Sequence, residues 1–323
     1  MTVDNTGLRR KVGPAVHSIC EFVFSVPDLD IAHHFYTKFG LDVKRVSEGL
    51  ELFTHGNAHR WARIFKGEGK KLLWITFGVD ECDFEKFKLR FSENGINLIQ
   101  PPPYATPDSL WIRGPDNVLI GLAISPKCAP SAKSARNFPP AIGPGGRAPS
   151  RSQTQPVRPT HLSHILLFSA DVPAATEFYI NVLGLRMSDK SADIIAFLHG
   201  AHGSDHHLLA LAKSDGLGIH HSSWNVNSID EVGLGKQQMA EVGYVKGWGI
   251  GRHVLGSNYF QYVRDPWGSY AEYSYDIDFV AHDHEWPAAD HPAADALYVW
   301  GPDVPADFVR NYETQTQSAG DKT

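Results

Sequence analysis

The chain has 323 residues, of which 42% are hydrophobic and 20% are charged; these are globular proportions and allow two ordinary domains. The formal net charge is −6 and like charges form no blocks, which argues against a surface for nucleic acid or an anionic membrane. We find no apolar run long enough for a membrane span and no secretion-signal core near the start. Three cysteines far apart in sequence predict no disulfide framework and no cysteine zinc site. A cytoplasmic globular protein is expected.

The first predicted elements are an apolar strand, a turn and an amphipathic helix within Phe22 to Tyr36, FVFSVPDLDIAHHFY. Asp and Pro in the turn are typical of a helix start, and Gly40 predicts the helix end. We expect the first folded unit over residues 14–126. Residues 127–158, which begin KCAPSAKSARNFPPAIGPGG, are rich in Pro, Gly and Ser and predict a linker.

The chain after the linker repeats the chain before it. ILLFSADVPAATEFY (165–179) overlays without gaps on FVFSVPDLDIAHHFY, and RDPWGSYAEYSYD (264–276) resembles RGPDNVLIGLAIS (113–125). Such a repeat predicts two copies of one architecture. The second unit is expected over residues 159–282, followed by a polar tail over residues 283–323.

Each half divides again into two modules. In the second half, Gly, Asn and Asp punctuate a further series of predicted elements. These are strands at 185–189, 193–199, 206–212 and 219–226, a helix at 230–242, and strands at 244–250, 258–264 and 270–275. The pattern is βαβββ, four times overall, which predicts an α+β protein of two tandem domains. Each domain should be a curved open barrel with helices outside.

Histidine is unevenly distributed, because five of the 17 precede residue 127 and twelve lie from His161 onward. Histidine is the commonest metal ligand and titrates near neutral pH, so chemistry is expected in the second half. The repeat overlay singles out three positions there. They are His164 opposite Glu21, His221 opposite Trp74, and Glu272 opposite Gly121.

These three residues predict a metal site. A lone histidine at a strand start is more often a surface or hydrogen-bonded residue, but three polar residues at repeat-matched positions favour a shared function. Glu272 lies in an apolar strand, where an unpaired carboxylate is costly and a cation would remove the cost. Two histidines and one carboxylate on one face form the ligand set of non-haem Fe(II) enzymes.

Four segments carry a resemblance to a known family: SHILLFSADVPAATEFYINVLG, HHLLALA, IHHSSWNV and GRHVLGSNYFQYVRDPWGSYAEYS. They resemble the type I extradiol ring-cleaving dioxygenases of the vicinal oxygen chelate superfamily, above all the catechol 2,3-dioxygenase (metapyrocatechase-like) branch. The resemblance implies two tandem vicinal-oxygen-chelate domains, with metal only in the second. The family's iron ligands fall on His164, His221 and Glu272.

The resemblance implies further site residues. His207 would be the acid–base residue that exchanges a proton with the substrate, while His206, its strand neighbour, should point to the opposite face and be structural. His253 and Tyr262 match residues that hydrogen-bond the substrate's oxygens. Asn258 stands near the place where some relatives carry a carboxylate.

The implied activity is Fe(II)-dependent cleavage of a catechol-type diol by O2, beside the two hydroxyls, to a muconic semialdehyde-type product. The implied partners are a small aromatic diol and O2. The surface needs of such sheets favour a homo-oligomer, and the charge and hydropathy patterns predict neither a nucleic-acid nor a membrane partner. Two alternatives remain open: another metal-dependent enzyme of the superfamily, such as an isomerase or lyase, or a non-enzymatic aromatic-binding protein. Plausible cavity walls are Trp224, Trp248, Phe260 and Trp267.

Overall fold

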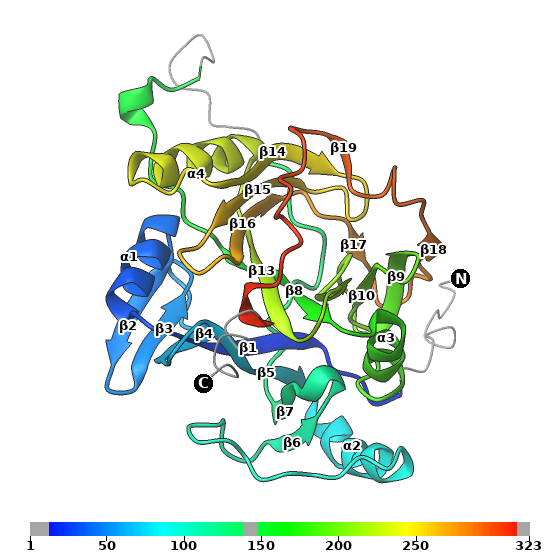
Figure 1. The fold of residues 1–323 in the computed structure, drawn as a ribbon. Helices are drawn as coiled ribbons and strands as arrows, with labels where there is room; N and C mark the ends of the chain where they lie inside the picture. The colour runs from blue at the N-terminus through cyan, green and yellow to red at the C-terminus, as the bar shows by residue number, and fades with distance from the viewer. Residues whose placement is uncertain (1–12, 138–147, 315–323) are drawn as a thin grey trace, which may run out of the picture.

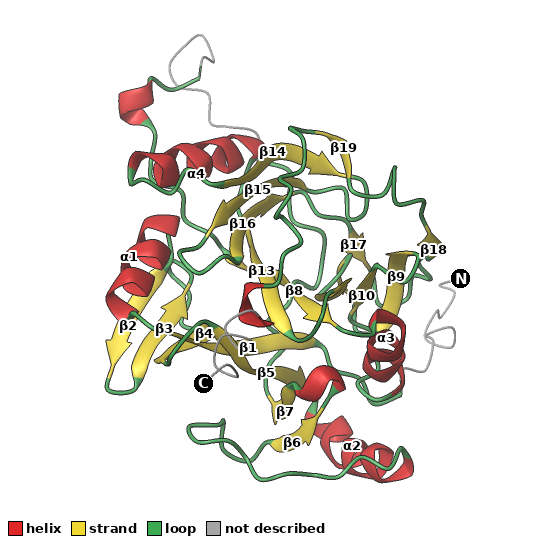
Figure 2. Ribbon diagram, viewed as in Figure 1, coloured by secondary structure: helices red, strands yellow, loops and turns green. Residues whose placement is uncertain are grey.

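The computed structural model describes residues 13–137 and 148–314, which form two large curved sheets with helices at the periphery (Figure 1, Figure 2). Residues 1–12, 138–147 and 315–323 lie outside the described residues, and with them the start of the chain and parts of the predicted linker and tail. Within the described residues, no helix is long and apolar enough to cross a membrane.

The first half builds a seven-stranded sheet in the order β2-β3-β4-β1-β5-β7-β6. Its strands are β1 (Ser18–Val26), β2 (Asp42–Val46), β3 (Gly49–Phe53), β4 (Arg60–Lys66), β5 (Lys71–Val79), β6 (Leu110–Arg113) and β7 (Leu119–Ile124). Its helices are α1 (Leu29–Phe39), α2 (Glu81–Glu93) and the 3-10 turn η2 (Pro115–Asn117).

The second half builds a ten-stranded sheet in the order β18-β9-β10-β12-β8-β13-β16-β15-β14-β19. Its strands are β8 (His161–Ser169), β9 (Arg186–Ser191), β10 (Ile195–His199), β12 (Leu209–Lys213), β13 (Gly218–Asn225), β14 (Gly247–His253), β15 (Tyr259–Arg264), β16 (Tyr270–Tyr275), β18 (Ala289–Asp290) and β19 (Tyr298–Trp300). Strands β11 (Ser204–Asp205) and β17 (Phe279–Val280) form a separate pair. The helices are η3 (Arg151–Gln153), α3 (Val172–Asn181) and α4 (Ile229–Glu241).

The two sheets repeat one topology, as the sequence predicts. In the first sheet Thr76 pairs with Gly121, and at the equivalent register of the second sheet Ser223 pairs with Glu272. The second module of the first half differs from the expected pattern, because only β6 and β7 follow its helix. The stretch where a further strand is expected contains three prolines at 101–103, which lack the amide hydrogens that a sheet ladder needs.

Local sequence sets the helix ends. The Asp28 carboxylate caps α1 by accepting hydrogen bonds from the amides of Asp30 and Ile31. Gly40 then ends the helix at φ 105°, a conformation that glycine adopts without strain. Asp171 caps α3 in the same way by accepting from the amide of Ala174.

The two halves share one hydrophobic core, and α1 of the first half lies beside α4 of the second (Figure 1). The Phe39 ring stacks on Tyr273 of β16 with centroids 4.0 Å apart, and the Tyr273 hydroxyl donates to the Phe39 carbonyl oxygen at 2.8 Å. Because side chains alternate along a strand, Tyr273 facing the first half leaves Glu272 facing the interior of the second sheet. Contact between the halves therefore holds the strand that carries Glu272.

The segment predicted as a polar tail is partly structured. It adds β18 and β19 at the two edges of the second sheet, and its last described part runs back across that sheet (Figure 1). Glu313 accepts hydrogen bonds from the backbone amides of Leu72 and Ile219, one in each half. Phe308 is buried, so this segment forms part of the molecule's interior.

Candidate active site

Three adjacent strands bring His164, His221 and Glu272 together. The two histidine Nε2 atoms lie 3.1 Å apart, and the Glu272 Oε2 atom lies 3.3 Å from His164 Nε2 and 3.5 Å from His221 Nε2. All three side chains are buried. They come from β8, β13 and β16, which are neighbours in the second sheet.

This arrangement fits a metal ion. Ligand bonds of about 2.1 Å that meet at roughly 90° to 109° place their donor atoms about 3.0 to 3.4 Å apart, close to the separations found here. Glu272 Oε2 is fully buried and has no hydrogen-bond partner. An ionised oxygen without a partner is costly in such a place, and a cation would satisfy it.

The His221 ring is oriented by a chain that ends on a carbonyl oxygen. Phe308 O can only accept a hydrogen bond, so His220 Nε2, 2.8 Å away, must donate. Because burial lowers the pKa of His220 to about 4, this ring is neutral and its Nδ1 accepts from His221 Nδ1 at 2.7 Å. His221 Nε2 therefore carries no hydrogen and presents its lone pair to the site.

A second chain orients His164. The Ser163 hydroxyl donates to the Asp205 carboxylate at 2.9 Å, so the Ser163 oxygen accepts from His164 Nδ1 at 3.3 Å. Burial raises the pKa of Asp205 to about 6, which leaves the carboxyl ionised at neutral pH. His164 Nε2 is then also free of hydrogen, as a metal ligand must be.

His207 lies beside the triad, with its ring centroid 4.0 Å from that of His164. His206 Nε2 donates to the Asp189 carboxylate at 2.9 Å, and His206 Nδ1 accepts from His207 Nδ1 at 3.0 Å. His207 Nε2 is thereby left without a hydrogen. Burial, together with the neighbouring His164, lowers the pKa of His207, so the ring is neutral and able to accept a proton.

His206 and His207 lie in the turn between β11 and β12. The sequence predicts them within a strand at 206–212, but the observed strand β12 starts after them. His206 turns its Nε2 toward Asp189 and packs against Trp286, while its Nδ1 stays in contact with His207. His291 also reaches the Asp189 carboxylate, at 2.8 Å. Several contacts thus hold the Asp189 carboxylate, which in turn anchors His206. None of these contacts is evident from sequence spacing.

His253 and Tyr262 form a hydrogen-bonded pair at the site. His253 Nδ1 donates to the Leu297 carbonyl oxygen at 2.7 Å, so His253 Nε2 accepts from the Tyr262 hydroxyl at 2.9 Å. Burial lowers the pKa of His253 and raises that of Tyr262, which keeps both groups neutral. His253 Nε2 lies 3.8 Å from Glu272 Oε1.

Asn258 contacts the proposed carboxylate ligand directly. Its Nδ2 donates to Glu272 Oε1 at 3.2 Å and to the Ser274 hydroxyl at 2.9 Å. This bond occupies Oε1 and leaves Oε2 for the space between the histidines.

A cavity of about 90 Å³ opens onto these residues. Beyond the polar site residues its walls are apolar: Leu166, Ile195, Phe197, Ala212, Leu255, Ala296, Leu297, Phe308 and Val309. Four of these wall residues belong to the C-terminal segment, for which the sequence predicts only a polar tail.

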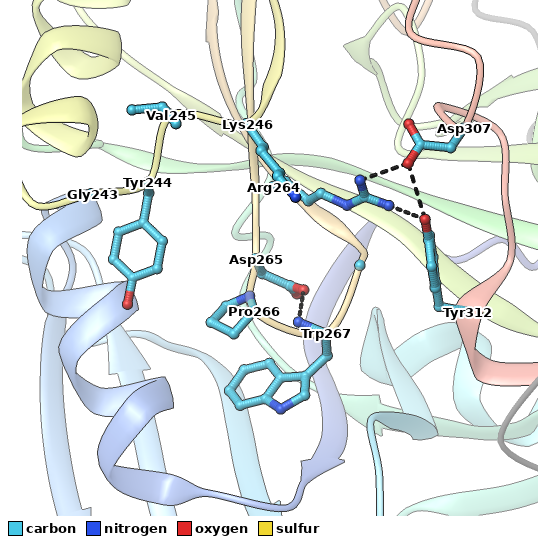
Figure 3. A pocket seen from close by; sticks show the side chains of 11 residues that line it. Gly243, Tyr244, Val245, Lys246, Arg264, Asp265, Pro266, Trp267, Asp307 and Tyr312 are labelled. Atoms are coloured by element: carbon cyan, nitrogen blue, oxygen red, sulfur yellow. Dashed lines mark hydrogen bonds and ion pairs between the residues drawn. The ribbon is translucent and has the colours of Figure 1, made fainter.

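The prediction of an aromatic wall is wrong, since Trp224, Trp248, Phe260 and Trp267 do not line this cavity. The first three are packed in the core, and Trp267 lies in a separate surface cavity beside Arg264 and Tyr312 (Figure 3).

The equivalent place in the first half is filled. Trp111 pairs with Gly121 just as Tyr262 pairs with Glu272, and a Cβ on Gly121 would lie 2.8 Å from the Trp111 ring. The Glu21 carboxylate is held by Arg63 at 2.6 and 2.8 Å. Sequence overlay finds the substituted ligands but misses Trp111, because its effect depends on the register of β6.

Comparisons with known proteins agree with this geometry. Residues 161–273 match the Glyoxalase/Bleomycin resistance protein/Dioxygenase superfamily. A Mn(II)-bound glyoxalase from Novosphingobium aromaticivorans shares the fold with a TM-score of 0.73 at 24% identity, over 90% of this chain and 93% of that one. BphC, a halotolerant catechol dioxygenase, does so with a TM-score of 0.72 at 18% identity, over 92% and 98%. Fold and site thus define a vicinal-oxygen-chelate protein.

A protein that is similar in sequence identifies the family within this superfamily. Metapyrocatechase 2 of Cupriavidus necator is 49% identical over 299 residues, which cover 93% of each chain. The chain belongs to the extradiol ring-cleaving dioxygenases of this superfamily, in the metapyrocatechase-like branch. It is therefore an enzyme, and it carries a buried site suited to a metal.

Proposed function

We propose that this enzyme cleaves a catechol-type diol with O2 beside its two hydroxyls, using one Fe(II) held by His164, His221 and Glu272. The observation that carries the proposal is the convergence of two hydrogen-free Nε2 atoms and the unpartnered Glu272 Oε2 at the end of an apolar cavity. Three protein ligands on one face leave room for both diol oxygens and O2. The name of the sequence relative supports the same reaction.

Iron in this site would bind the diol and O2 together and allow electron density to pass from the aromatic ring to oxygen. The chain's own residues supply orientation and proton transfer. His207 is the proton acceptor, because its Nε2 carries a lone pair and its Nδ1 hydrogen is committed to His206. The proton held on Nε2 is then available to an oxygen atom of the product.

His253 and Tyr262 stabilise charge on the substrate's oxygens. The Tyr262 hydroxyl donates to His253 in the structure, and the same hydrogen can be donated to an oxygen atom that enters the cavity. Because both groups are neutral, Tyr262 is buried and His253 is only slightly exposed, such a hydrogen bond is strong and carries no charge of its own. His253 stays fixed through its bond to Leu297 O.

The cavity walls favour a ring with apolar substituents. No Lys or Arg lines the cavity within the described residues, so a carboxylated catechol would find no cationic partner there. Unsubstituted and alkyl-substituted catechols fit these walls. The ring-opened product from catechol would be a muconic semialdehyde.

The decisive experiment is anaerobic reconstitution with Fe(II), followed by O2 uptake and product mass spectrometry with catechol. We expect stoichiometric O2 consumption and a yellow semialdehyde that contains both oxygen atoms. A colourless muconic diacid would refute extradiol cleavage. Reconstituted protein that isomerises or binds aromatic compounds without consuming O2 would instead point to another metal-dependent enzyme of the superfamily or to a binding protein.

A further inference from the structure

Two cysteines meet in the first half, away from the candidate active site. Cys20 lies on β1 and Cys128 lies in the segment that follows β7, 108 positions later in the sequence. Their Sγ atoms are 3.8 Å apart. Sequence spacing predicts no disulfide, because the contact depends on how this segment crosses β1.

The surroundings of the two sulfur atoms differ. Cys20 is buried and its Sγ lies 3.1 Å from the Ser125 hydroxyl, whereas Cys128 is partly accessible. His59 Nε2 donates to the Cys20 carbonyl oxygen at 2.9 Å, and the Cys128 sulfur lies 3.5 Å from the Ile19 carbonyl oxygen. The backbone amide of Cys128 donates to Ser18.

These contacts make Cys128 the more acidic of the two thiols. The hydrogen bond between the sulfur atoms, with the hydrogen bond and charge of His59, holds the pKa of Cys128 below its ordinary value despite burial. The same sulfur–sulfur contact and burial raise the pKa of Cys20. A thiolate beside a protonated thiol is the arrangement in which one cysteine reacts and its neighbour resolves the product.

We propose that Cys20 and Cys128 form an oxidisable dithiol that reacts with hydrogen peroxide, with Cys128 as the nucleophile and Cys20 as the resolving thiol. The Cys128 thiolate attacks one peroxide oxygen, the O–O bond breaks, and hydroxide leaves, which gives a sulfenic acid. The Cys20 sulfur then attacks the Cys128 sulfur, the S–O bond breaks, and water leaves with the Cys20 proton. Two electrons pass from the sulfurs to the peroxide, and one disulfide is formed.

The backbone allows this reaction. Cys128 lies in an extended stretch without regular structure, between β7 and the linker, while Cys20 is fixed within β1. Closing the sulfur atoms from 3.8 Å to a bond of about 2.05 Å requires them to approach by roughly 2 Å.

The same segment is anchored further on, where Lys133 and Arg136 bind Asp276 at 2.8 and 3.0 Å. The disulfide would tie one end of this segment to β1, while the two ion pairs hold the other end just past β16.

The chain contains its own control, because the third cysteine, Cys82, is exposed on α2 and has no cysteine neighbour among the described residues. The full-length, metal-loaded protein is treated with stoichiometric hydrogen peroxide, its thiols are trapped, and its peptides are mapped without reduction. We expect free thiols to fall from three to one, with the remaining thiol on Cys82 and a linked Cys20–Cys128 peptide. Retention of all three thiols, or oxidation of Cys82 in preference, would overturn the proposal.

Two cysteine variants test which thiol is the nucleophile and which is the resolving thiol. Cys20→Ser should leave Cys128 as a sulfenic acid that dimedone traps, whereas Cys128→Ser should leave Cys20 reduced. Equal trapping of Cys20 in Cys128→Ser would contradict the division into nucleophile and resolving thiol.

His59→Gln should slow formation of the linked peptide by about tenfold or more, since the thiolate fraction falls tenfold for each unit by which the thiol pKa rises above neutral pH. An unchanged rate would remove His59 from the proposal. Cys82→Ser should form the linked peptide at the rate of the unaltered protein.

Discussion

Four histidine rings around the candidate site have one nitrogen fixed by a chain that ends on an acceptor. The chains end on the Asp205 carboxylate, the Asp189 carboxylate, Phe308 O and Leu297 O. Because none of these end groups donates a hydrogen bond, each chain determines the tautomer of its histidine. All four Nε2 atoms are thereby left as acceptors at the site. The same residue types without these partners would present a mixture of tautomers.

This orientation makes metal affinity depend on residues that do not bind the metal. Ser163→Ala should weaken metal binding by about tenfold, because His164 Nδ1 would lose its partner. Affinity is measured by competition with a chelating indicator. Ser191→Ala is the matched control, since the Ser191 hydroxyl is also buried but has no hydrogen-bond partner. Equal affinities for the two variants would contradict the orienting role.

The ligands themselves should be indispensable. His221→Ala should retain no iron after dialysis, whereas His161→Ala, which alters a histidine on the same strand as His164, should retain one iron per chain. Metal analysis of both variants gives the result directly. Full iron retention in His221→Ala would refute the assignment of the site.

His207 and His206 should separate in their effects. His207→Phe should keep its iron and lower turnover by roughly two to four orders of magnitude, as expected for a positioned acid–base group. His206→Phe should lower turnover less, because His207 keeps its place beside His164 but loses the acceptor for its Nδ1 hydrogen. Turnover and iron content are measured on the same samples. A larger loss in His206→Phe would reverse the two roles.

At the scale of elements, β16 connects the site to the rest of the molecule. Successive residues of β16 face opposite ways. Glu272 faces the two metal-site histidines, and Tyr273 faces α1. The C-terminal segment closes the cavity through Phe308 and Leu297, whose carbonyl oxygens also hold His220 and His253. One element therefore both covers the cavity and orients two of its histidines.

The contact of β16 with α1 should contribute to stability. Tyr273→Phe leaves the buried Phe39 carbonyl without its donor and should lower the free energy of unfolding by about 1–3 kcal/mol. Tyr275→Phe, on the same strand, removes a longer hydrogen bond of 3.3 Å to Asn137 and should cost less. The free energy of unfolding of each variant is measured by urea denaturation, and the two values are compared. A smaller loss in Tyr273→Phe would argue against this contact between the halves.

At the scale of the whole molecule, two copies of one architecture have separate roles. The first copy fills its centre with Trp74 and Trp111 and neutralises Glu21 with Arg63, while the second keeps an open cavity. Shared packing across the halves lets the first copy support the strand that carries Glu272.

Restoring the ligand residues in the first half should not restore a metal site. The triple variant Glu21→His, Trp74→His, Gly121→Glu should still bind one iron per chain, because the Trp111 ring lies 2.8 Å from the position of a Cβ at Gly121. Metal analysis of folded protein measures the ratio. A ratio of two would show that residue type alone suffices.

Much of this protein can be read from its sequence, because repeats and periodicity are local properties. The overlay of the two halves predicts two copies of one architecture and places His164, His221 and Glu272 at repeat-matched positions, and the two sheets show the matching registers. The predicted strand at 270–275 agrees with β16 for the same reason. Alternation along a strand then suffices to place the triad on one face.

Tertiary structure alone decided the features that depend on distant backbone groups. The carbonyl oxygens of Phe308 and Leu297 orient two site histidines, yet a carbonyl is common to every residue and leaves no mark in the sequence. The filling of the first cavity by Trp111 and the meeting of Cys20 with Cys128 arise in the same way. Each of these features arises because two segments that are distant in sequence, or two neighbouring strands, pack against each other. Residue type alone does not encode which segments come close together.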